Sequence, residues 1–276
     1  MAVAGAASGG VEPGTQQYQQ QQRRRQRPQF GDRVQAGQQL ARGLGEYADG
    51  TAVVVSVGRG GAVVAAAVAA ALGRGVPHLH YRVEAIPCAQ LPRLSLGSVA
   101  GDGSVRIDAM VAGSLGVDAG APDAATMRAI RAIDRRLRRA QDAFCRAPPG
   151  ARELDGRTVI VVDDGIEAGD TMREAVLHLR HCFAPRQVVV AAPVCLADAR
   201  KHLRRHADAV VDVVSPLSVG SVAQWYAGGA QPTPAEQRVL ARLFAGPQRC
   251  QPWAPEARVA PSPPGTPRAS PHPGPQ

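Results

Sequence analysis

Short, continuously apolar segments alternate with longer amphipathic segments along the middle of this 276-residue chain. Uninterrupted β-branched runs are typical of strands that helices cover on both faces, and apolar positions three and four residues apart indicate helices. The predicted strands are residues 51–57, 77–83, 159–162, 188–193 and 209–214. The predicted helices are residues 32–47, 62–72, 124–144, 171–182, 196–206 and 234–244. This order predicts an α/β fold with a mainly parallel sheet flanked by helices.

A predicted hairpin interrupts this alternation between the second and third strands. Residues 95–100 and 105–108 form its strands, and Gly101-Asp102-Gly103-Ser104 supplies the turn. The long helix at 124–144 follows and carries Arg128, Arg131, Arg135, Arg136, Arg138 and Arg139. Together the hairpin and this helix predict an inserted hood region beside the parallel sheet.

The two ends of the chain differ in composition from the middle. Residues 1–29 are rich in Gly, Ala, Gln and Arg, and residues 246–276 are rich in Pro. Such segments bury too little apolar area to offset the entropy of the chain, so we expect disordered tails. One domain over residues 30–245 remains, which is long enough for a single α/β core.

The chain is strongly basic, with a formal net charge of +9 and a pI of about 10.1. Nearly all of this charge is arginine, since Lys201 is the only lysine, which indicates a compositional bias of the coding sequence. The Arg23–Arg27 cluster and the arginines of the long helix are interpreted as solvated surfaces, although they leave nucleic-acid binding as an alternative. A positive field is also compatible with an enzyme that handles phosphates.

The five cysteines show neither metal-ligand spacing nor a disulfide framework: Cys88, Cys145, Cys182, Cys195 and Cys250. We therefore expect free thiols in a reducing, cytoplasmic compartment and no protein-held metal. No uninterrupted apolar stretch reaches transmembrane length, so no membrane association is expected. The arginine-rich, acid-poor N-terminus is also compatible with an organelle transit peptide.

Residues 159–171 carry the most informative chemistry of the chain. The apolar strand ends in Asp163-Asp164, at the edge where a parallel sheet opens its ligand crevice. Paired carboxylates accept hydrogen bonds and therefore suit the two hydroxyls of a vicinal diol. Ala168-Gly169-Asp170-Thr171 then leads into a helix, and its backbone N–H groups suit an anion. The stretch predicts a site for a sugar phosphate; the alternative is an ordinary strand-to-helix turn with an Asp cap.

A second loop with affinity for anions follows the first predicted strand. Gly58-Arg59-Gly60-Gly61 reads as a glycine-rich turn before the helix at 62–72. The planar guanidinium of Arg59 suits a diphosphate, and the glycines let backbone N–H groups approach it. The alternative is a surface arginine in a flexible turn. No Gly-Lys-Ser/Thr follows, so the loop is not a Walker A motif.

The strand, the acidic pair and the Gly-x-Thr loop resemble the 5-phosphoribosyl-1-diphosphate (PRPP) motif of the type I phosphoribosyltransferases. The resemblance extends from about Phe30 to Phe244, with the opening Phe30-Gly31-Asp32-Arg33, the Arg-Gly-Gly loop and the closing Gly-x-x-x-Trp-Tyr at 220–226. It is closest to bacterial stand-alone members. The resemblance implies transfer of phosphoribosyl from PRPP to a nitrogenous base, with release of diphosphate and with Mg²⁺ held mainly through the substrate.

The same resemblance implies roles for individual residues. Asp163 and Asp164 would hold the ribose hydroxyls, and residues 168–171 the 5-phosphate. Arg59, Gly60 and Gly61 would hold the diphosphate. Glu167 occupies the position of a base-handling acid in purine-type members; its alternative is a solvated loop carboxylate. Trp225 or Tyr226 could stack on the acceptor base, or could serve packing within the core or in a homodimer.

Several positions depart from the family pattern. Ala168 replaces a hydroxyl-bearing residue, and Asp170 adds a carboxylate to the phosphate loop. Arg82-Val83 and Leu91-Pro92-Arg93 stand where the bacterial subgroup has Arg-Lys and a Pro-Glu segment. These departures favour a second hypothesis, a catalytically impaired regulator or scaffold that binds PRPP or a nucleotide.

Overall fold

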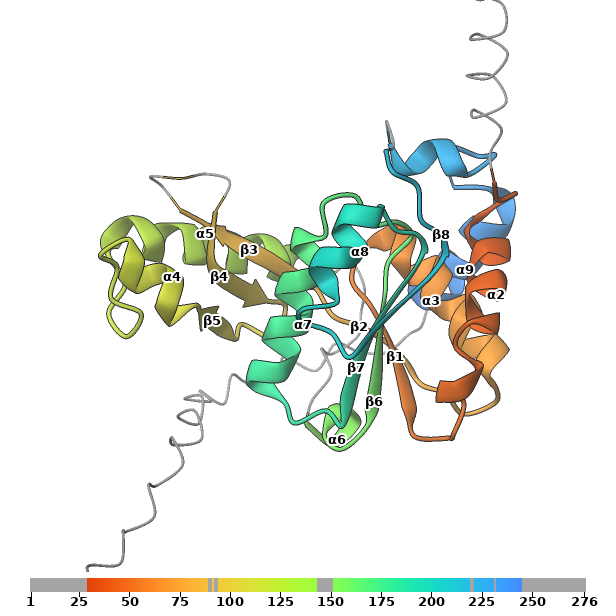
Figure 1. The fold of residues 1–276 in the computed structure, drawn as a ribbon, viewed down its shortest axis with the longest axis horizontal. Coiled ribbons are helices and arrows are strands. Elements are labelled where there is room, and N and C mark those ends of the chain that lie inside the picture. Colours follow the sequence, from red (N-terminus) through yellow and green to blue (C-terminus); the bar gives the residue numbers. More distant parts are fainter. Residues whose placement is uncertain are drawn as a thin grey trace, which may run out of the picture.

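The computed structural model describes residues 29–88, 91, 94–142, 151–218, 221–230 and 232–244. Except for Gln29, the predicted tails lie outside the described residues, as do Pro92, Arg93, Cys145, Gly220 and Cys250. A central sheet is flanked by helices on both faces, and a smaller sheet with its own helices stands to one side (Figure 1). The predicted α/β class with an inserted hood is confirmed.

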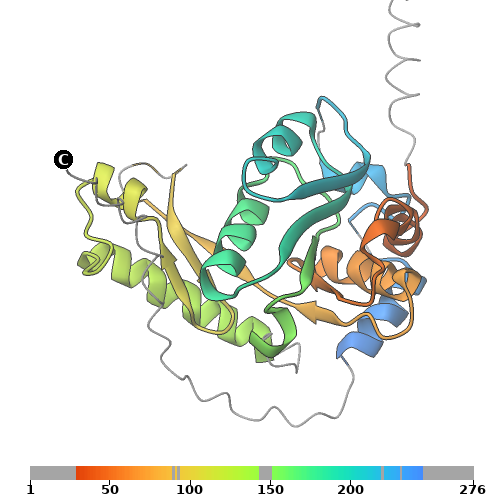
Figure 2. The same ribbon diagram turned by 60° about the horizontal axis from the view of Figure 1, so that its bottom comes forward.

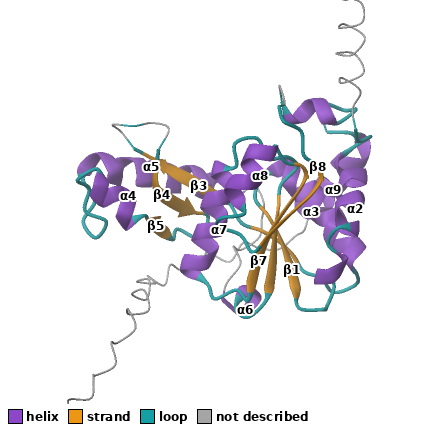
Figure 3. Cartoon of the chain, in the orientation of Figure 1, coloured by secondary structure: helices purple, strands orange, loops and turns teal. Residues whose placement is uncertain are grey.

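The central sheet is entirely parallel, in the order β2-β1-β6-β7-β8. Its strands are β1 (Ala52–Ser56), β2 (His78–His80), β6 (Thr158–Val162), β7 (Gln187–Val194) and β8 (Ala209–Val214). All residues of β1 and β6 are buried, because helices cover both faces of the sheet. Figure 3 separates these strands from the helical layers.

Alternate residues of each strand face opposite layers of helices. Val53, Val55, Val159 and Val161 pack with helices α7 (Asp170–Cys182) and α8 (Ala197–Leu203). Val54, Ile160 and their neighbours on the other face pack with α2 (Arg33–Arg42) and α3 (Arg59–Leu72). Helix α9 (Pro234–Phe244) joins this second layer, as Figure 1 shows.

The hood consists of a three-stranded antiparallel sheet and two helices, and we use the name for these elements throughout. Its strands are β3 (Val83–Pro87), β4 (Ser95–Ala100) and β5 (Val105–Ile107), in that order. Its helices are α4 (Ala109–Ser114) and α5 (Ala124–Asp142), and α5 packs on β3 and β4 around Ile86, Leu96 and Leu137. Figure 2 shows α5 along the outer side of this sheet.

The structure corrects several predicted boundaries. The predicted strand at 77–83 is divided, because β2 ends at His80 and Val83 already begins the hood sheet. The helix predicted at 32–47 ends at Arg42 and is followed by a 3₁₀ turn, η1 (Gly45–Tyr47). The helix predicted at 196–206 spans only residues 197–203.

The remaining elements are short. Helix α6 (Ala151–Leu154) precedes β6, and the 3₁₀ turn η2 (Val222–Trp225) follows β8. Phe30 bridges Tyr226 just after η2, so that the beginning of the described chain packs against the segment after η2. Within the described residues, no helix is both long enough and apolar enough to cross a bilayer.

Candidate functional site

The predicted site residues lie at the point where the order of the central sheet reverses direction. The chain passes from β1 to its neighbour β2 on one side, whereas β6, β7 and β8 follow on the other side. Ser56 and Val162, the last residues of β1 and β6, are partners in the parallel ladder. The segments that follow these strands therefore leave the sheet side by side, at the topological switch point where open α/β sheets bind ligands.

The glycine segment after β1 is the beginning of helix α3, which corrects the predicted loop. Gly58 is the N-cap, and its carbonyl accepts a hydrogen bond from Ala62 N at 2.9 Å. The first N–H groups of a helix have no partner within the helix, so those of Arg59, Gly60 and Gly61 remain suited to an anion. The Arg59 side chain is exposed at the first position of the helix.

The glycines bring this helix into contact with the acidic pair. A Cβ atom at Gly61 would lie 2.6 Å from Asp163 Oδ1, and one at Gly60 would collide with the Asp164 carboxylate. Side chains at either position would therefore displace a carboxylate. The structure thus brings together two predicted parts of the site, the anion-binding glycine segment at 58–61 and the diol-binding acidic pair at 163–164. They lie about 100 residues apart in the chain.

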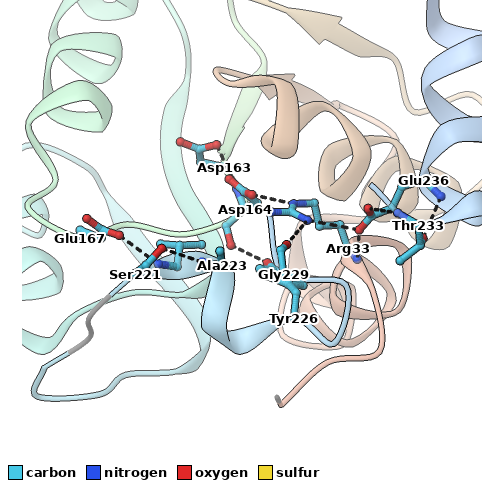
Figure 4. Close-up of polar contacts among 11 residues, drawn as sticks. Arg33, Asp163, Asp164, Glu167, Ser221, Ala223, Tyr226, Gly229, Thr233 and Glu236 are labelled. Carbon is cyan, nitrogen blue, oxygen red and sulfur yellow. Dashed lines mark hydrogen bonds and ion pairs between the residues drawn. The ribbon is translucent and has the colours of Figure 1, made fainter. Parts of the chain in front are cut away.

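The two carboxylates have different surroundings (Figure 4). Asp164 Oδ2 accepts a hydrogen bond from Arg33 Nε at 2.7 Å, and its side chain is 20% exposed. Asp163 Oδ1 accepts one from Asp164 N at 3.0 Å. Burial raises the pKa of Asp163, and the charge of neighbouring Asp164 raises this pKa further. A ligand that donates hydroxyl hydrogens or brings positive charge would offset this penalty.

The segment between β6 and α7, which carries the predicted 5-phosphate contacts at residues 168–171, is held against the end of β7 and leads directly into α7. Ile166 N donates to Val194 O at 2.8 Å, and Leu196 N donates to Ile166 O at 2.9 Å. Gly169 has a φ of +86°, a left-handed conformation that favours glycine, and is the N-cap. Helix α7 therefore begins at Asp170, one residue before the predicted start.

A pocket of about 330 Å³ opens at this loop. It is lined by Asp163, residues 165–172 and Val222, which include every predicted 5-phosphate contact. Backbone N–H groups at the N-terminus of α7 and the helix dipole favour an anion there. Asp170 is exposed at the first turn of α7 and is one of the residues that line this pocket.

Glu167 has a role that neither sequence interpretation included. Its side chain is exposed, as expected for a solvated loop residue, but Oε1 also accepts a hydrogen bond from Val222 N at 3.0 Å. This contact holds the start of η2 against the segment between β6 and α7 (Figure 4). The predicted function of Glu167 as a base for the acceptor stays a prediction.

Tyr226 packs within the core, which was one of the two alternatives predicted for it, and its contact with an acceptor base stays a prediction. Its side chain is only 2% exposed, and its ring centroid lies 5.6 Å from that of Phe30. Its hydroxyl donates to the main-chain oxygen of Asp164 at 2.5 Å. Trp225 is partly buried against the same cluster, and its contact with a base stays a prediction.

Sequence reasoning missed two charged residues that complete the site, Arg33 and Glu236. Glu236 is buried; its Oε1 accepts from Arg33 N at 2.7 Å and its Oε2 accepts from Thr233 N at 2.8 Å. Arg33 belongs to the opening tetrapeptide at 30–33, which supported the resemblance but carried no assigned chemistry. No spacing rule links a residue before β1 to a carboxylate 131 positions later.

Comparison with known proteins agrees with this geometry. A curated protein of Mycobacterium tuberculosis strain H37Rv, named "Putative phosphoribosyl transferase Rv0571c", is 32% identical over 197 residues, which are 71% of this chain. A protein of strain CDC 1551, named "Putative phosphoribosyl transferase MT0597", matches with the same identity and coverage. The chain spans only 43% of the length of these relatives. No family model matches the chain.

A solved structure of the protein TT1426 from Thermus thermophilus covers 79% of this chain and 98% of its own length, with 29% identity and a TM-score of 0.67. Its extent agrees with the described domain. The chain belongs to the type I phosphoribosyltransferase family, as its sequence motifs and its curated relatives indicate.

Proposed function

We propose that this protein transfers the 5-phosphoribosyl group of PRPP to a nitrogenous base and releases diphosphate. The observation that carries the proposal is the meeting of three features at one switch point: an acidic pair, a glycine-lined helix N-terminus and a pocket at a second helix N-terminus. Each feature suits one part of PRPP. Together they match a ligand that carries a diol between two phosphate groups.

The proposed binding mode follows from the positions of these groups. Asp163 and Asp164 accept hydrogen bonds from the ribose hydroxyls, and the 5-phosphate enters the pocket lined by residues 165–172. Arg59 and the N–H groups of Gly60 and Gly61 face the diphosphate. Fixed donors around the leaving diphosphate stabilise the negative charge that develops as its bond to the sugar breaks.

Mg²⁺ is the proposed cofactor and, when bound, would neutralise part of the diphosphate charge. The described residues contain no group of three or more His, Cys, Asp or Glu side chains that could hold a metal. Mg²⁺ commonly binds through substrate phosphates and waters, with one or two carboxylates nearby. The partly exposed Asp163 at the edge of the pocket fits such an arrangement.

A second candidate function is a PRPP-binding or nucleotide-binding regulator with impaired catalysis. Ala168 lines the proposed phosphate pocket without a hydroxyl donor, and the exposed, negatively charged Asp170 is also one of its lining residues. Like charges at the pocket would weaken phosphate binding. The identity of the acceptor base and a homodimeric state remain predictions of the resemblance.

Titration calorimetry of PRPP with Mg²⁺, followed by a diphosphate-release assay with a panel of nucleobases, tests both candidates. We expect binding by the wild-type protein and its loss in the double variant Asp163→Asn, Asp164→Asn. Asp118→Asn, an exposed residue of the hood segment, serves as the control and should bind normally. Binding without diphosphate release for any base would favour the regulator. No binding by folded wild-type protein would overturn the assignment of the site.

A further inference from the structure

Arg33 approaches the acidic pair from helix α2, outside the strands that carry the predicted motifs (Figure 4). Its side chain is only 10% exposed, and its Nε donates to Asp164 Oδ2 at 2.7 Å. Its Nη1 lies 3.3 Å from Gly229 O and 3.5 Å from Glu236 Oε1. Its guanidinium carbon lies 4.4 Å from the centroid of the Tyr226 ring. These contacts hold the guanidinium in one orientation.

Tyr226 provides a second, independent connection to the same aspartate. Its hydroxyl donates to the main-chain oxygen of Asp164 at 2.5 Å, while its ring packs beneath Arg33. Asp164 is thus held at its side chain by α2 and at its main chain by the segment after η2. An ordinary strand-to-helix turn does not require such a pair of connections.

The charges around Arg33 explain why a cation is needed at this position. Three carboxylates, those of Asp163, Asp164 and Glu236, lie near one another in a largely buried region. Two adjacent carboxylates disfavour each other's ionised form, and an arginine beside them favours it. Removing the cation would leave the Asp164 carboxylate without its charged partner and free to turn toward solvent. A carboxylate without a fixed orientation would be a poorer hydrogen-bond acceptor for a sugar hydroxyl.

We propose that Arg33 is a positioning residue that holds Asp164 as a fixed acceptor for the ribose hydroxyls of PRPP, without touching the ligand itself. This inference rests on the proposed function. It makes the segments before β1 and after η2 part of the binding site, although the PRPP motif lies elsewhere in the chain.

The test compares two ligands, PRPP with Mg²⁺ and inorganic diphosphate with Mg²⁺, by titration calorimetry. Arg33→Met removes the charge and keeps much of the apolar stem. We expect its PRPP affinity to fall about tenfold to a hundredfold, the range for loss of a hydrogen bond to a charged group. Its affinity for diphosphate should stay unchanged, because diphosphate lacks the ribose whose hydroxyls would donate hydrogen bonds to Asp164. Arg42→Met, an exposed arginine of the same helix, should leave both affinities unchanged.

Two further variants keep the inference testable if Arg33→Met folds poorly. Arg33→Lys restores a positive charge and should recover part of the PRPP affinity. Tyr226→Phe removes only the hydroxyl that holds the main chain of Asp164, and should weaken PRPP binding less than Arg33→Met does. Thermal unfolding of each variant shows whether it is folded at the temperature of the titration.

The outcomes separate the inference from the proposed function. If wild-type protein binds PRPP and both Arg33 variants bind it equally well, the positioning role is overturned and the proposed function stands. If Arg33→Met loses affinity for diphosphate and PRPP alike, the residue has a general structural role, which also overturns the inference. If folded wild-type protein binds no PRPP, both the proposed function and the positioning role of Arg33 are overturned.

Discussion

The central sheet and the hood are stabilised in different ways. Every residue of β1 and β6 is buried, and apolar side chains fill both faces of the sheet. In the hood, the middle strand β4 is buried except at its first residue, whereas the outer strands β3 and β5 each have exposed positions. Burial of apolar area is non-directional, so a small sheet with two partly exposed outer strands needs further contacts to fix its position on a neighbouring element.

The hood docks on helix α7 through buried polar groups. Arg106 Nη2 in β5 lies 2.6 Å from Glu174 Oε2, and Arg173 Nη2 lies 2.7 Å from Oε1 of the same glutamate. His178 contacts the hydroxyls of Ser98 and Ser104 at 2.9 and 2.8 Å. Because the N-terminus of α7 lines the pocket of the candidate site, these contacts also fix the hood relative to that site.

The largest expected effect concerns Glu174, whose side chain is 1% exposed. Glu174→Leu removes the close partner of the buried Arg106 and leaves it only Asp108, whose Oδ2 lies 3.6 Å from Arg106 Nη1. Breaking a buried pair in this way costs about 3–5 kcal/mol. Replacing both members, as in Arg106→Met with Glu174→Leu, should recover most of this loss. Urea denaturation measures both variants. A loss below about 1 kcal/mol in the single variant would show that the hood does not depend on this contact.

A smaller effect on the free energy of unfolding is expected at low pH, because His178 is buried in its neutral form. Burial lowers the pKa of His178 to about 3, with a further contribution from Arg106, against an ordinary value of 6.5. The unfolded chain binds the proton first, so stability is complete above pH 6.5 and falls as the pH decreases toward 3. The slope is about 1.4 kcal/mol per pH unit for one histidine. His80, in the central sheet, has a similarly lowered pKa of about 3 and makes a second contribution to the fall of stability with decreasing pH.

The variant His178→Gln should therefore flatten the acid dependence without abolishing it, as measured by urea denaturation between about pH 7 and pH 5. The control Ile160→Val removes one buried methylene of β6 and should cost about 0.5–1.5 kcal/mol at every pH. An unchanged slope in His178→Gln would show that protonation of His178 does not limit the docking of the hood.

The smallest effect is expected at Arg136 of α5, which forms an ion pair with Glu84 of β3. The arginine side chain is 62% exposed, so water and salt screen the pair. Arg136→Met should change the free energy of unfolding by about 1 kcal/mol or less, and added salt should reduce the difference. A loss as large as that of Glu174→Leu would mean that this exposed pair within the hood contributes as much to stability as the buried pair between the hood and α7.

The local elements and the motif were readable from the sequence for a physical reason. Continuous apolar runs specify strands buried on both faces, and the Val159–Val162 run with its two aspartates needs no distant residue to be recognised. Glycines before a helical segment likewise indicate close backbone approach. The beginning of α3 at Arg59 was missed, because a glycine-rich turn and a glycine-rich first turn of a helix have the same local pattern.

What the sequence determined by itself is the order of strands and helices and the chemistry of residues 58–61 and 163–171, since these depend on neighbours along the chain. The tertiary structure alone decided which distant groups serve that chemistry. Arg33, Tyr226 and Glu236 meet at Asp164 only because the sheet order places α2 and the segment after η2 beside the end of β6. The same holds for Glu174 and Arg106, which meet where the antiparallel hairpin of the hood packs on α7. Long-range pairing depends on packing between elements, and no local pattern encodes it.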